Sequence, residues 1–584
     1  MHCPNLKNLE VYGEVLRNKG DELINMELNN QNIGNDIENK NEGLNMSEQK
    51  QASDFTPDIN YQNLMGVNES EYTKAMRENF AFFGPATLLY ALLYTFCMYK
   101  NGSGITFLLF IAASIAYLHF ALPKLGLTVK KGSRFYFVSM LFLSVSTFCT
   151  DDGRIIFFNK TMIFFLVMSL LLHQFFDTSE WKLGKYLSSI LELIFCSISE
   201  LVSPFDDAIA YYKKSENKNK NVWYVALGLI ISVPILVIVL FLLSGADAVF
   251  REVTNSILEN VNVGNVFNII FRISFMFFAT YLLIAFLCRK SIKEDVKDKR
   301  NGEPVLAITI TSLLTIIYLF FSGIQIIYLF LGQMQLPEGY TYAEYAREGF
   351  FQLLAVSVLN LIIVLICMSF FKESRILKVI LTLMSVCTFI MIASSALRMI
   401  IYIRYYYMTF LRIFVLWSLV VLFLLFAGIV ISIYKERFPL FRYSMTVVTV
   451  LYIILSFSHP DYIIASVNLA NAPQSIEGMS RKSNNSLFLT DEAYNDFEYL
   501  SFLSADAAPA IIPYIEKIGY DLSVYYDMSK NEDDYYKYDK YGSTWKIDGF
   551  GNYYMYNIGK SCDKLSLRTY NVSRYVALKL IEGK

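Results

Sequence analysis

The sequence is poor in charge. Asp, Glu, Lys and Arg make up only 18% of its 584 residues, against roughly 25% in a typical soluble protein. The formal net charge is −1, so the chain has no overall positive field, and no Gly-rich basic stretch or zinc-type cluster compensates for its absence. We therefore expect no nucleic-acid partner.

Cysteine and histidine are also few and scattered. Of the eight cysteines, Cys97, Cys196, Cys288, Cys367 and Cys387 fall in or beside apolar runs. A secreted disulfide framework needs an even, clustered set of cysteines, which this distribution excludes. The four histidines lie far apart in the sequence, so we predict no metal site and no cofactor.

Long apolar runs are abundant instead. Hydrophobic residues make up 54% of the chain, above the roughly 45–50% of soluble proteins, and a bilayer core requires roughly 17–25 residues of helix. The runs cover approximately residues 80–98, 104–122, 135–150, 155–176, 222–243, 266–288, 305–331, 350–371, 378–397, 409–433 and 440–458. We therefore predict a mainly α-helical, polytopic membrane bundle of about eleven transmembrane helices.

The segments between these runs alternate in charge. Every even-numbered run is followed by a basic segment, such as Lys130 and Lys131 after the second and Arg289 and Lys290 after the sixth. Segments after odd-numbered runs hold fewer basic residues, with residues 398–404 as the exception. Because basic loops stay in the cytoplasm, we predict a cytoplasmic N-terminus, an extracytoplasmic C-terminus and a location in the cell (plasma) membrane.

The composition outside the runs predicts the domain organisation. Residues 1–75 are rich in Asn, Glu, Lys and Gln and bury too little apolar surface to fold, so we expect a disordered cytoplasmic tail. Residues 76–458 form the transmembrane domain. Within it, residues 181–205 place apolar side chains at three- and four-residue spacing, which indicates an amphipathic cytoplasmic helix, lying in the interface or packed on the bundle. Residues 459–584 form an extracytoplasmic C-terminal domain.

This C-terminal domain is predicted to be a small α+β fold. Residues 497–518 favour a helix interrupted by prolines, and residues 542–556 combine glycine with aromatic residues, which indicates strands or long turns. Asp506 and other acidic residues are candidate calcium ligands, but none follows the EF-hand spacing. A solvated acidic face is the alternative.

Candidate functional residues gather in the predicted outer loops. The group comprises Tyr342, Glu344, Tyr345, Arg347 and Glu348 before the eighth run, and Arg398, Arg404 and Arg412 around the ninth and tenth runs. Arginines among tyrosines are suited to a phosphate or an anionic headgroup. The structural alternative is a Thr-x-x-Glu capping box at the start of the eighth run, together with anchoring of aromatic and basic side chains in the interface.

Four further polar residues lie inside predicted spans, namely Arg272, His119, His173 and Asn360. A charge in the membrane costs roughly 2.5–3.5 kcal/mol on insertion scales, so Arg272 is a functional candidate. Its alternative is snorkelling toward the outer headgroups. For the two histidines and Asn360 we predict hydrogen bonds between helices rather than a proton relay.

Three segments of the sequence together resemble a known family. They are YAEYAREGFFQL at residues 342–353, YLSFLSADAAPA at 499–510 and NVSRY at 571–575. They resemble a family of uncharacterised multi-pass bacterial membrane proteins, a domain of unknown function with a Y-A-E-Y-A-R-x-G-F-F motif. Asn468 stands where that family opens its tail with Y-N-x-x-R, although Val467 replaces the tyrosine. The resemblance implies membrane topology and a bacterial envelope, and it implies no reaction.

Three functions remain open on the sequence alone. The first is a non-enzymatic sensor or accessory scaffold of the cell envelope, surrounded by membrane lipids, with residues 459–584 recognising an envelope protein. The second is a transporter or lipid flippase, for which Pro85 and Pro234 would break helices. The third is a membrane-embedded group transferase acting on a lipid-linked substrate, with Asp151 and Asp152 as the nearest acids. A loop turn explains these two acids equally well, so we assign no catalytic residue.

Overall fold

The structure is a computed structural model. It describes residues 70–178, 181, 183–214, 263–289, 300–327, 349–435, 437–470, 499–517, 547–563 and 565–582, with single residues between 228 and 250. The chain forms two compact units. The first unit comprises Met1–Gly84, Leu191–Lys220 and Phe278–Ile292, and the second comprises Pro85–Ile190, Asn221–Phe277 and Lys293–Lys584.

Long apolar helices dominate the described residues. They are α3 (Phe80–Met98), α4 (Thr106–Lys124), α5 (Ser133–Cys149), α6 (Gly153–Phe175), α11 (Val263–Cys288), α12 (Pro304–Gln325), α14 (Phe350–Phe370), α15 (Arg375–Tyr406), α16 (Phe410–Tyr434) and α17 (Leu440–Phe457). Nine of these are long and apolar enough to cross a membrane, and α5 is shorter, with 17 residues. The protein is therefore a multi-pass membrane protein.

The predicted runs correspond closely to these helices. Ten of the eleven each match one helix, whereas the fifth run, residues 222–243, lies largely outside the described part of the chain. The ninth run was predicted to end at residue 397, and that boundary is wrong because α15 continues to Tyr406. Arg398, just beyond the predicted end, lies inside this helix and is buried beside Gln325, with Nη2 3.4 Å from Gln325 Oε1.

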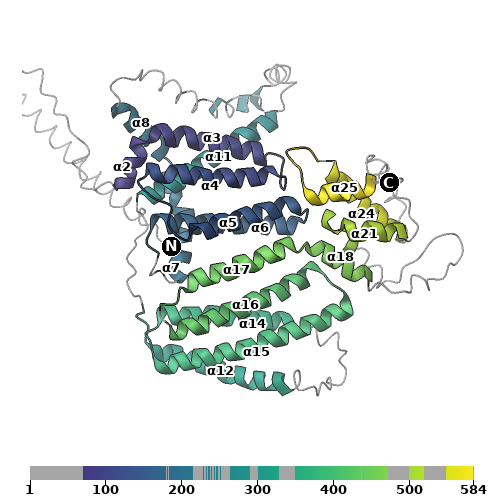
Figure 1. Cartoon of the computed structure of the whole chain (residues 1–584). Helices are drawn as coiled ribbons and strands as arrows, with labels where there is room; N and C mark the ends of the chain where they lie inside the picture. Colours follow the sequence, from purple (N-terminus) through teal and green to yellow (C-terminus); the bar gives the residue numbers. More distant parts are fainter. Residues whose placement is uncertain are drawn as a thin grey trace, which may run out of the picture. The chain divides into compact units, whose positions relative to one another are not determined.

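The membrane helices of the second unit pack in a continuous series (Figure 1). Helix α5 contacts α4 and α6, α17 contacts α5, α6 and α16, and α15 contacts α16, α14 and α12. Gly428 allows the closest approach of α16 and α17, because a Cβ atom there would lie 2.2 Å from a ring carbon of Tyr443. Tyr443 in turn donates to the Leu424 carbonyl at 2.8 Å.

The amphipathic segment is two helices rather than one. Helix α7 (Leu183–Cys196) runs into the short helix η1 (Ser197–Glu200), and α8 (Ser203–Lys214) follows after a bend of 56°. The predicted helix over residues 181–205 therefore corresponds to α7 and η1, which end at Glu200, and α8 begins at its C-terminal end. Pro204 at the second position of α8 lacks the N–H that a continuous helix would need there.

The first unit has a buried ionic core of its own. Arg77 of α2 (Glu71–Glu78) forms an ion pair with Asp207 of α8 at 2.9 Å, and Tyr281 donates to the same carboxylate at 2.9 Å. Arg289 pairs with Glu200 at 2.9 Å. The first pair connects α2 with α8 and the second connects the end of α11 with η1. The hydropathy of any of these helices alone does not predict such contacts.

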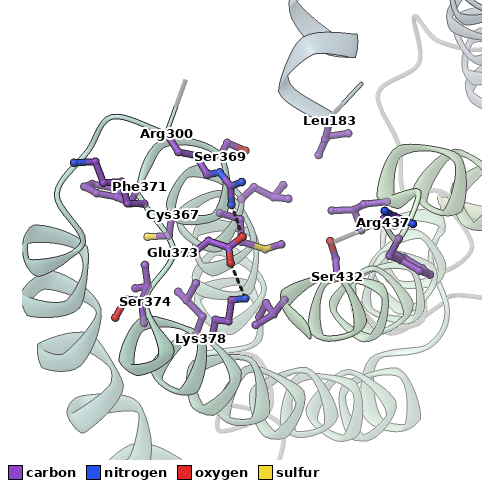
Figure 2. A pocket seen from close by; sticks show the side chains of 18 of the residues that line it. Leu183, Arg300, Cys367, Ser369, Phe371, Glu373, Ser374, Lys378, Ser432 and Arg437 are labelled. Atoms are coloured by element: carbon purple, nitrogen blue, oxygen red, sulfur yellow. Dashed lines mark hydrogen bonds and ion pairs between the residues drawn. The ribbon is translucent and has the colours of Figure 1, made fainter. Parts of the chain in front are cut away.

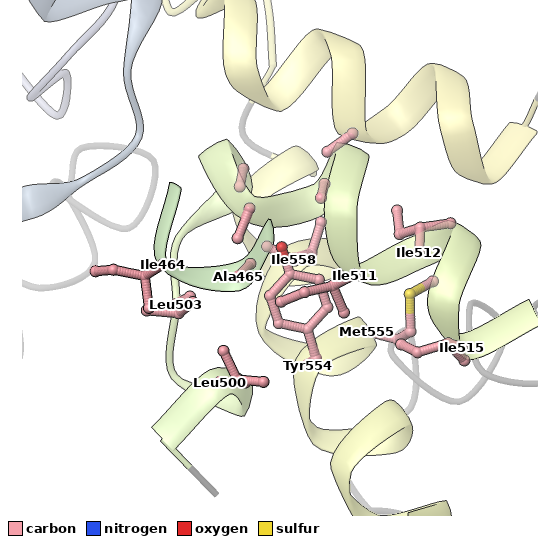
Figure 3. Close-up of a cluster of buried hydrophobic side chains, with 14 of the residues drawn as sticks. Ile464, Ala465, Leu500, Leu503, Ile511, Ile512, Ile515, Tyr554, Met555 and Ile558 are labelled. Atoms are coloured by element: carbon pink, nitrogen blue, oxygen red, sulfur yellow. The ribbon is translucent and has the colours of Figure 1, made fainter. Parts of the chain in front are cut away.

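The C-terminal helices, as named here, are α18 (Pro460–Ala470), η3 (Ala505–Ala507), α21 (Ala508–Lys517), α24 (Ile547–Cys562) and α25 (Val572–Glu582). They enclose an apolar core in which Tyr554 and Met555 of α24 meet Ile511 of α21 and Ile464 of α18 (Figure 3). Membrane helix α5 contacts α25, and α16 contacts α18. This core therefore lies against the ends of the membrane helices.

The predicted strands at residues 542–556 are wrong where the structure describes them. Residues from Ile547 onward form α24, and the described part of the chain contains no strand, only an isolated bridge between Gly302 and Phe371. Tyr554 and Ile558 are both buried and one helical turn apart. The aromatic residues that suggested strands therefore form the buried face of a helix.

Candidate functional site

A cluster of charged and polar side chains joins the membrane helices to the C-terminal helices. The junction cluster, as named here, consists of Asp151, Asp152, Arg154, His459, Asp461, Asp506, Asn571 and Arg574. These residues come from the α5–α6 connection, the corner between α17 and α18, η3 and the start of α25. All of them belong to the second unit.

Asp506 lies at the centre of the cluster. Its fully buried carboxylate accepts hydrogen bonds from Thr150 Oγ1 at 2.5 Å and from the Asp151 N–H at 2.7 Å, and lies 3.1 Å from His459 Nδ1. Burial alone would raise the pKa of Asp506, but the hydrogen bonds from His459, Thr150 and the Asp151 backbone outweigh it and lower that pKa. The same bond to Asp506 raises the pKa of His459.

Asp151 binds the start of α25. Arg574 places Nε 2.7 Å and Nη2 2.6 Å from Asp151 Oδ1, and Ser561 donates to Oδ2 at 3.0 Å. Burial raises the pKa of Asp151, and the charge and hydrogen bonds of Arg574 oppose that rise. A carboxylate held in this way is engaged in fixing α24 and α25 to the α5–α6 connection.

Asn571 caps α25 and also ties it to two loops. Its Oδ1 accepts the Arg574 N–H at 3.2 Å, the geometry of an N-cap residue. Its Nδ2 donates to the Thr150 carbonyl at 2.8 Å and to the Ser103 carbonyl at 3.3 Å. One buried amide therefore stabilises the helix terminus and its contact with the membrane helices together.

Arg154 joins the start of α6 to α18. Asp152 caps α6, accepting the Arg154 N–H at 2.9 Å, and also receives the Arg154 guanidinium at 2.9 Å. The same guanidinium forms an ion pair with Asp461, whose other oxygen accepts the Ser504 N–H at 3.0 Å. Burial and the neighbouring Asp152 raise the pKa of Asp461, and Arg154 opposes them.

The charged groups of the cluster form ion pairs with one another. Its four carboxylates each contact an arginine or a histidine of the cluster, and three of those carboxylate side chains are at most 2% exposed. Asp151 and Asp152, the acids considered for group transfer, are both in such pairs. No group of three or more His, Cys, Asp or Glu residues in the described segments is arranged to hold a metal ion.

The group of tyrosines, acids and arginines predicted in the outer loops is only partly described by the structure. Tyr342, Glu344, Tyr345, Arg347 and Glu348 lie outside the residues that the structure describes.

The three arginines predicted beside that loop have separate partners. Arg398 is buried, with Nη2 3.4 Å from Gln325 Oε1. Arg412 donates to the Tyr406 and Tyr407 carbonyls, and its guanidinium lies 4.3 Å from the Tyr402 ring centre. Arg404 is exposed. Among the described residues, Arg412 makes the contacts expected of the predicted arginine and tyrosine group, with Tyr402, Tyr406 and Tyr407.

The polar residues predicted inside spans make local contacts. Asn360 of α14 donates to Thr388 of α15 at 3.0 Å, a hydrogen bond between helices. His173 lies 3.1 Å from the Lys131 carbonyl, and His119 is exposed beside Phe120. Arg272 is half-buried within α11. These four residues are distributed over four helices and do not form a common site.

Sequence reasoning missed a buried polar group next to the junction. Asn159 of α6 accepts from Tyr452 at 2.8 Å and from Ser456 at 2.7 Å, both on α17. Ser146 of α5 donates to the Ser456 carbonyl at 3.0 Å. The signal that could have identified this group is a single polar residue within an apolar run, since Asn159 lies inside the predicted span 155–176.

The comparisons with known proteins give one result. A family model with the description Domain of unknown function (DUF4153) matches residues 137–514. No curated protein matches the chain, and no solved structure matches it. The matched range contains the α5–α6, α18 and η3 residues of the junction cluster, whereas Asn571 and Arg574 lie beyond it.

Proposed function

We propose a function from the site alone. The chain belongs to the family described as Domain of unknown function (DUF4153), and this description names no reaction. The protein is a non-enzymatic accessory scaffold or sensor of the bacterial cell envelope. Its C-terminal helices lie outside the plasma membrane and recognise an envelope protein, and its N-terminus is cytoplasmic. The observation that carries this proposal is the junction cluster, which fixes the C-terminal helices to the membrane helices.

A second attachment supports a fixed rather than a mobile C-terminal domain. Asn468 of α18 accepts the Met408 N–H at 2.8 Å and donates to the Met408 carbonyl at 3.0 Å. Tyr499 OH accepts the Phe410 N–H at 3.0 Å. The turn between α15 and α16 is thereby bound to the same domain that the junction cluster binds to α5 and α6. Attachment at two places suits a domain that presents one constant surface to a partner.

The state of the acids favours this function over group transfer. A general acid or base must reach the reacting group of its substrate, and Asp151 and Asp152 are directed at Arg574 and Arg154 instead. Their roles in capping α6 and in binding α25 account for both residues. The positive-inside pattern of the loops supports the proposed orientation.

Exchanging the charges of one pair tests the proposal. The full-length chain is expressed in native membranes as wild type, as Arg574→Asp, and as the double variant Asp151→Arg with Arg574→Asp, followed by cross-linking and quantification of the partner. We expect the single variant to lose the cross-linked partner and the double variant to recover a substantial part of it. Lys579→Asp, on the exposed face of α25, is the matched control.

Two outcomes contradict the proposal. One is that wild-type protein gives no specific cross-linked partner in native membranes. The other is that the exchanged variant fails to complement a deletion phenotype that wild type complements, although α25 remains docked. The carboxylate of Asp151 would then have a role besides its ion pair.

A further inference from the structure

The second unit contains a cavity at the other end of α17. It has a volume of about 720 Å³ and is bordered by the ends of α14 and α16 and the starts of α15 and α17 (Figure 2). Leu183 at the start of α7 and Arg300 before α12 complete its border. A cavity of this size falls within the roughly 300–1,000 Å³ of small-molecule sites.

The border of this cavity carries an excess of positive charge. Its charged residues are Arg300, Lys372, Lys378, Arg437 and a single acid, Glu373. Glu373 forms ion pairs with Arg300 and, at 2.9 Å, with Lys378. Arg437 is exposed and lies across the cavity from these three residues, as Figure 2 shows. Lys372 also pairs with Glu303, which lies just outside the lining, at 2.6 Å. Four basic groups and two carboxylates still leave an excess of positive charge with which the border can hold a further anion.

The backbone holds one side of this border in place. The Gly302 N–H donates to the Phe370 carbonyl at 3.1 Å, and the Lys372 N–H donates to the Gly302 carbonyl at 3.0 Å. A Cβ atom at Gly302 would lie 2.7 Å from the Phe371 ring, so this approach requires glycine. Arg300 is thereby positioned beside the start of α15 before any ligand arrives.

The rest of the lining is apolar and continues along the membrane helices. It includes Leu365 and Met368 of α14, Leu377 and Leu381 of α15, and Phe441 of α17. Ser369, Ser374 and Ser432 also line the cavity. A basic rim above an apolar wall matches an amphiphile that has an anionic head and a hydrocarbon chain.

We propose that this cavity binds an anionic phospholipid, with the phosphate of its headgroup between Arg437 and the Arg300 side of the border. An acyl chain would lie along the apolar wall. The apolar wall favours a lipid over free phosphate, because free phosphate has no apolar group that could pack against it. Basic pockets between membrane helices on the cytoplasmic side are suited to anionic headgroups, and the basic loops place this end of α17 there. The proposal is independent of the scaffold function.

Lipid binding to the purified full-length protein tests it. The protein in neutral detergent is titrated with phosphatidylglycerol and with phosphatidylcholine, and native mass spectrometry gives the apparent Kd of each. We expect phosphatidylglycerol to bind more tightly, and Arg437→Gln to weaken it by about fivefold, as for removal of one basic group near a headgroup. Lys435→Gln is the matched control, because Lys435 is exposed and adjacent but does not line the cavity.

The remaining outcomes each overturn the proposal. Equal binding of the two lipids means that the headgroup charge is not recognised. Equal weakening by Arg437→Gln and Lys435→Gln means that lipid responds to surface charge and not to this cavity. Displacement of phosphatidylglycerol by an equal concentration of inorganic phosphate means that the cavity is a site for a free anion.

Discussion

The two ends of α17 arrange their charges in opposite ways. At the junction cluster, four carboxylates that are at most 9% exposed pair with two arginines and a histidine, and these pairs connect several chain segments. At the basic cavity, four bases outnumber the two acids that pair with them, Glu373 and Glu303, and both members of each pair are at least 21% exposed. The first arrangement connects parts of the chain, whereas the second leaves charge available for something outside it.

This difference has a physical basis. A buried ion pair is strongly destabilising when one partner is removed, because the other is left buried and charged. An exposed pair is screened by water and salt and contributes about 0–1 kcal/mol. Substitutions of similar chemistry at the two ends should therefore differ in size, and this contrast defines the predictions below.

The largest effect is expected at Arg574. Arg574→Ala leaves the Asp151 side chain, 9% exposed, without its ion pair, and should lower the free energy of unfolding of the C-terminal helices by about 3–5 kcal/mol. Hydrogen exchange of α25 in the full-length protein measures this. Arg437→Ala at the basic cavity is the comparison, and a loss there of similar size would remove the distinction between the two ends.

Asn571 separates helix capping from docking. Asn571→Ala removes both and should cost about 1–2 kcal/mol. Asn571→Asp retains the cap but loses the donors to the Thr150 and Ser103 carbonyls, so it should be destabilising without fraying of α25. Equal exchange rates for the first turn of α25 in the two variants would show that the cap contributes nothing.

A smaller, pH-dependent effect is expected at His459. Because its pKa is raised by Asp506, the stabilisation is fully present below about pH 6.5 and is lost as the pH rises through the raised pKa. The variant His459→Asn has no titrating group at this position. Asparagine tolerates the left-handed backbone there, where φ is 48°. Wild-type Tm should therefore fall more between pH 6 and pH 9 than Tm of the variant. Parallel curves contradict this assignment.

The smallest effect is expected for an exposed pair beside the basic cavity. Lys372 and Glu303 are 2.6 Å apart, with side chains 53% and 71% exposed. Lys372→Gln should change the free energy of unfolding by less than about 0.5 kcal/mol, with any change disappearing at high salt. Thermal unfolding at low and high ionic strength measures it, and a salt-independent loss above 1 kcal/mol would show that this end is also held by its ion pairs.

The membrane helices could be predicted from the sequence because hydropathy is a local property. Ten runs of apolar residues were sufficient to locate ten helices. Local properties do not predict tertiary contacts, as at Arg398, a charged residue that is buried within α15 beside Gln325. They failed again at Tyr554, where an aromatic segment that favours strands forms a helix because one of its faces packs on the C-terminal core.

The junction cluster could be predicted only in part. The strings at residues 499–510 and 571–575 contain Asp506, Asn571 and Arg574, so the family resemblance already marked three of its eight residues. Their partners could not be inferred, because Arg574 and Asp151 are 423 residues apart in the chain. No periodicity or spacing connects residues at that separation. The basic cavity was missed for the same reason, since its bases were used only as indicators of orientation.

The central claim is that the C-terminal helices are fixed to the membrane helices through the junction cluster. A double-mutant cycle of Asp151→Asn and Arg574→Gln tests it most directly, with the opening free energy of α25 measured by hydrogen exchange in the full-length protein in lipid nanodiscs. The claim predicts a coupling energy of about 1.5–3 kcal/mol, as for hydrogen bonds to charged groups. Two single effects that add to the double effect within about 0.5 kcal/mol would contradict it.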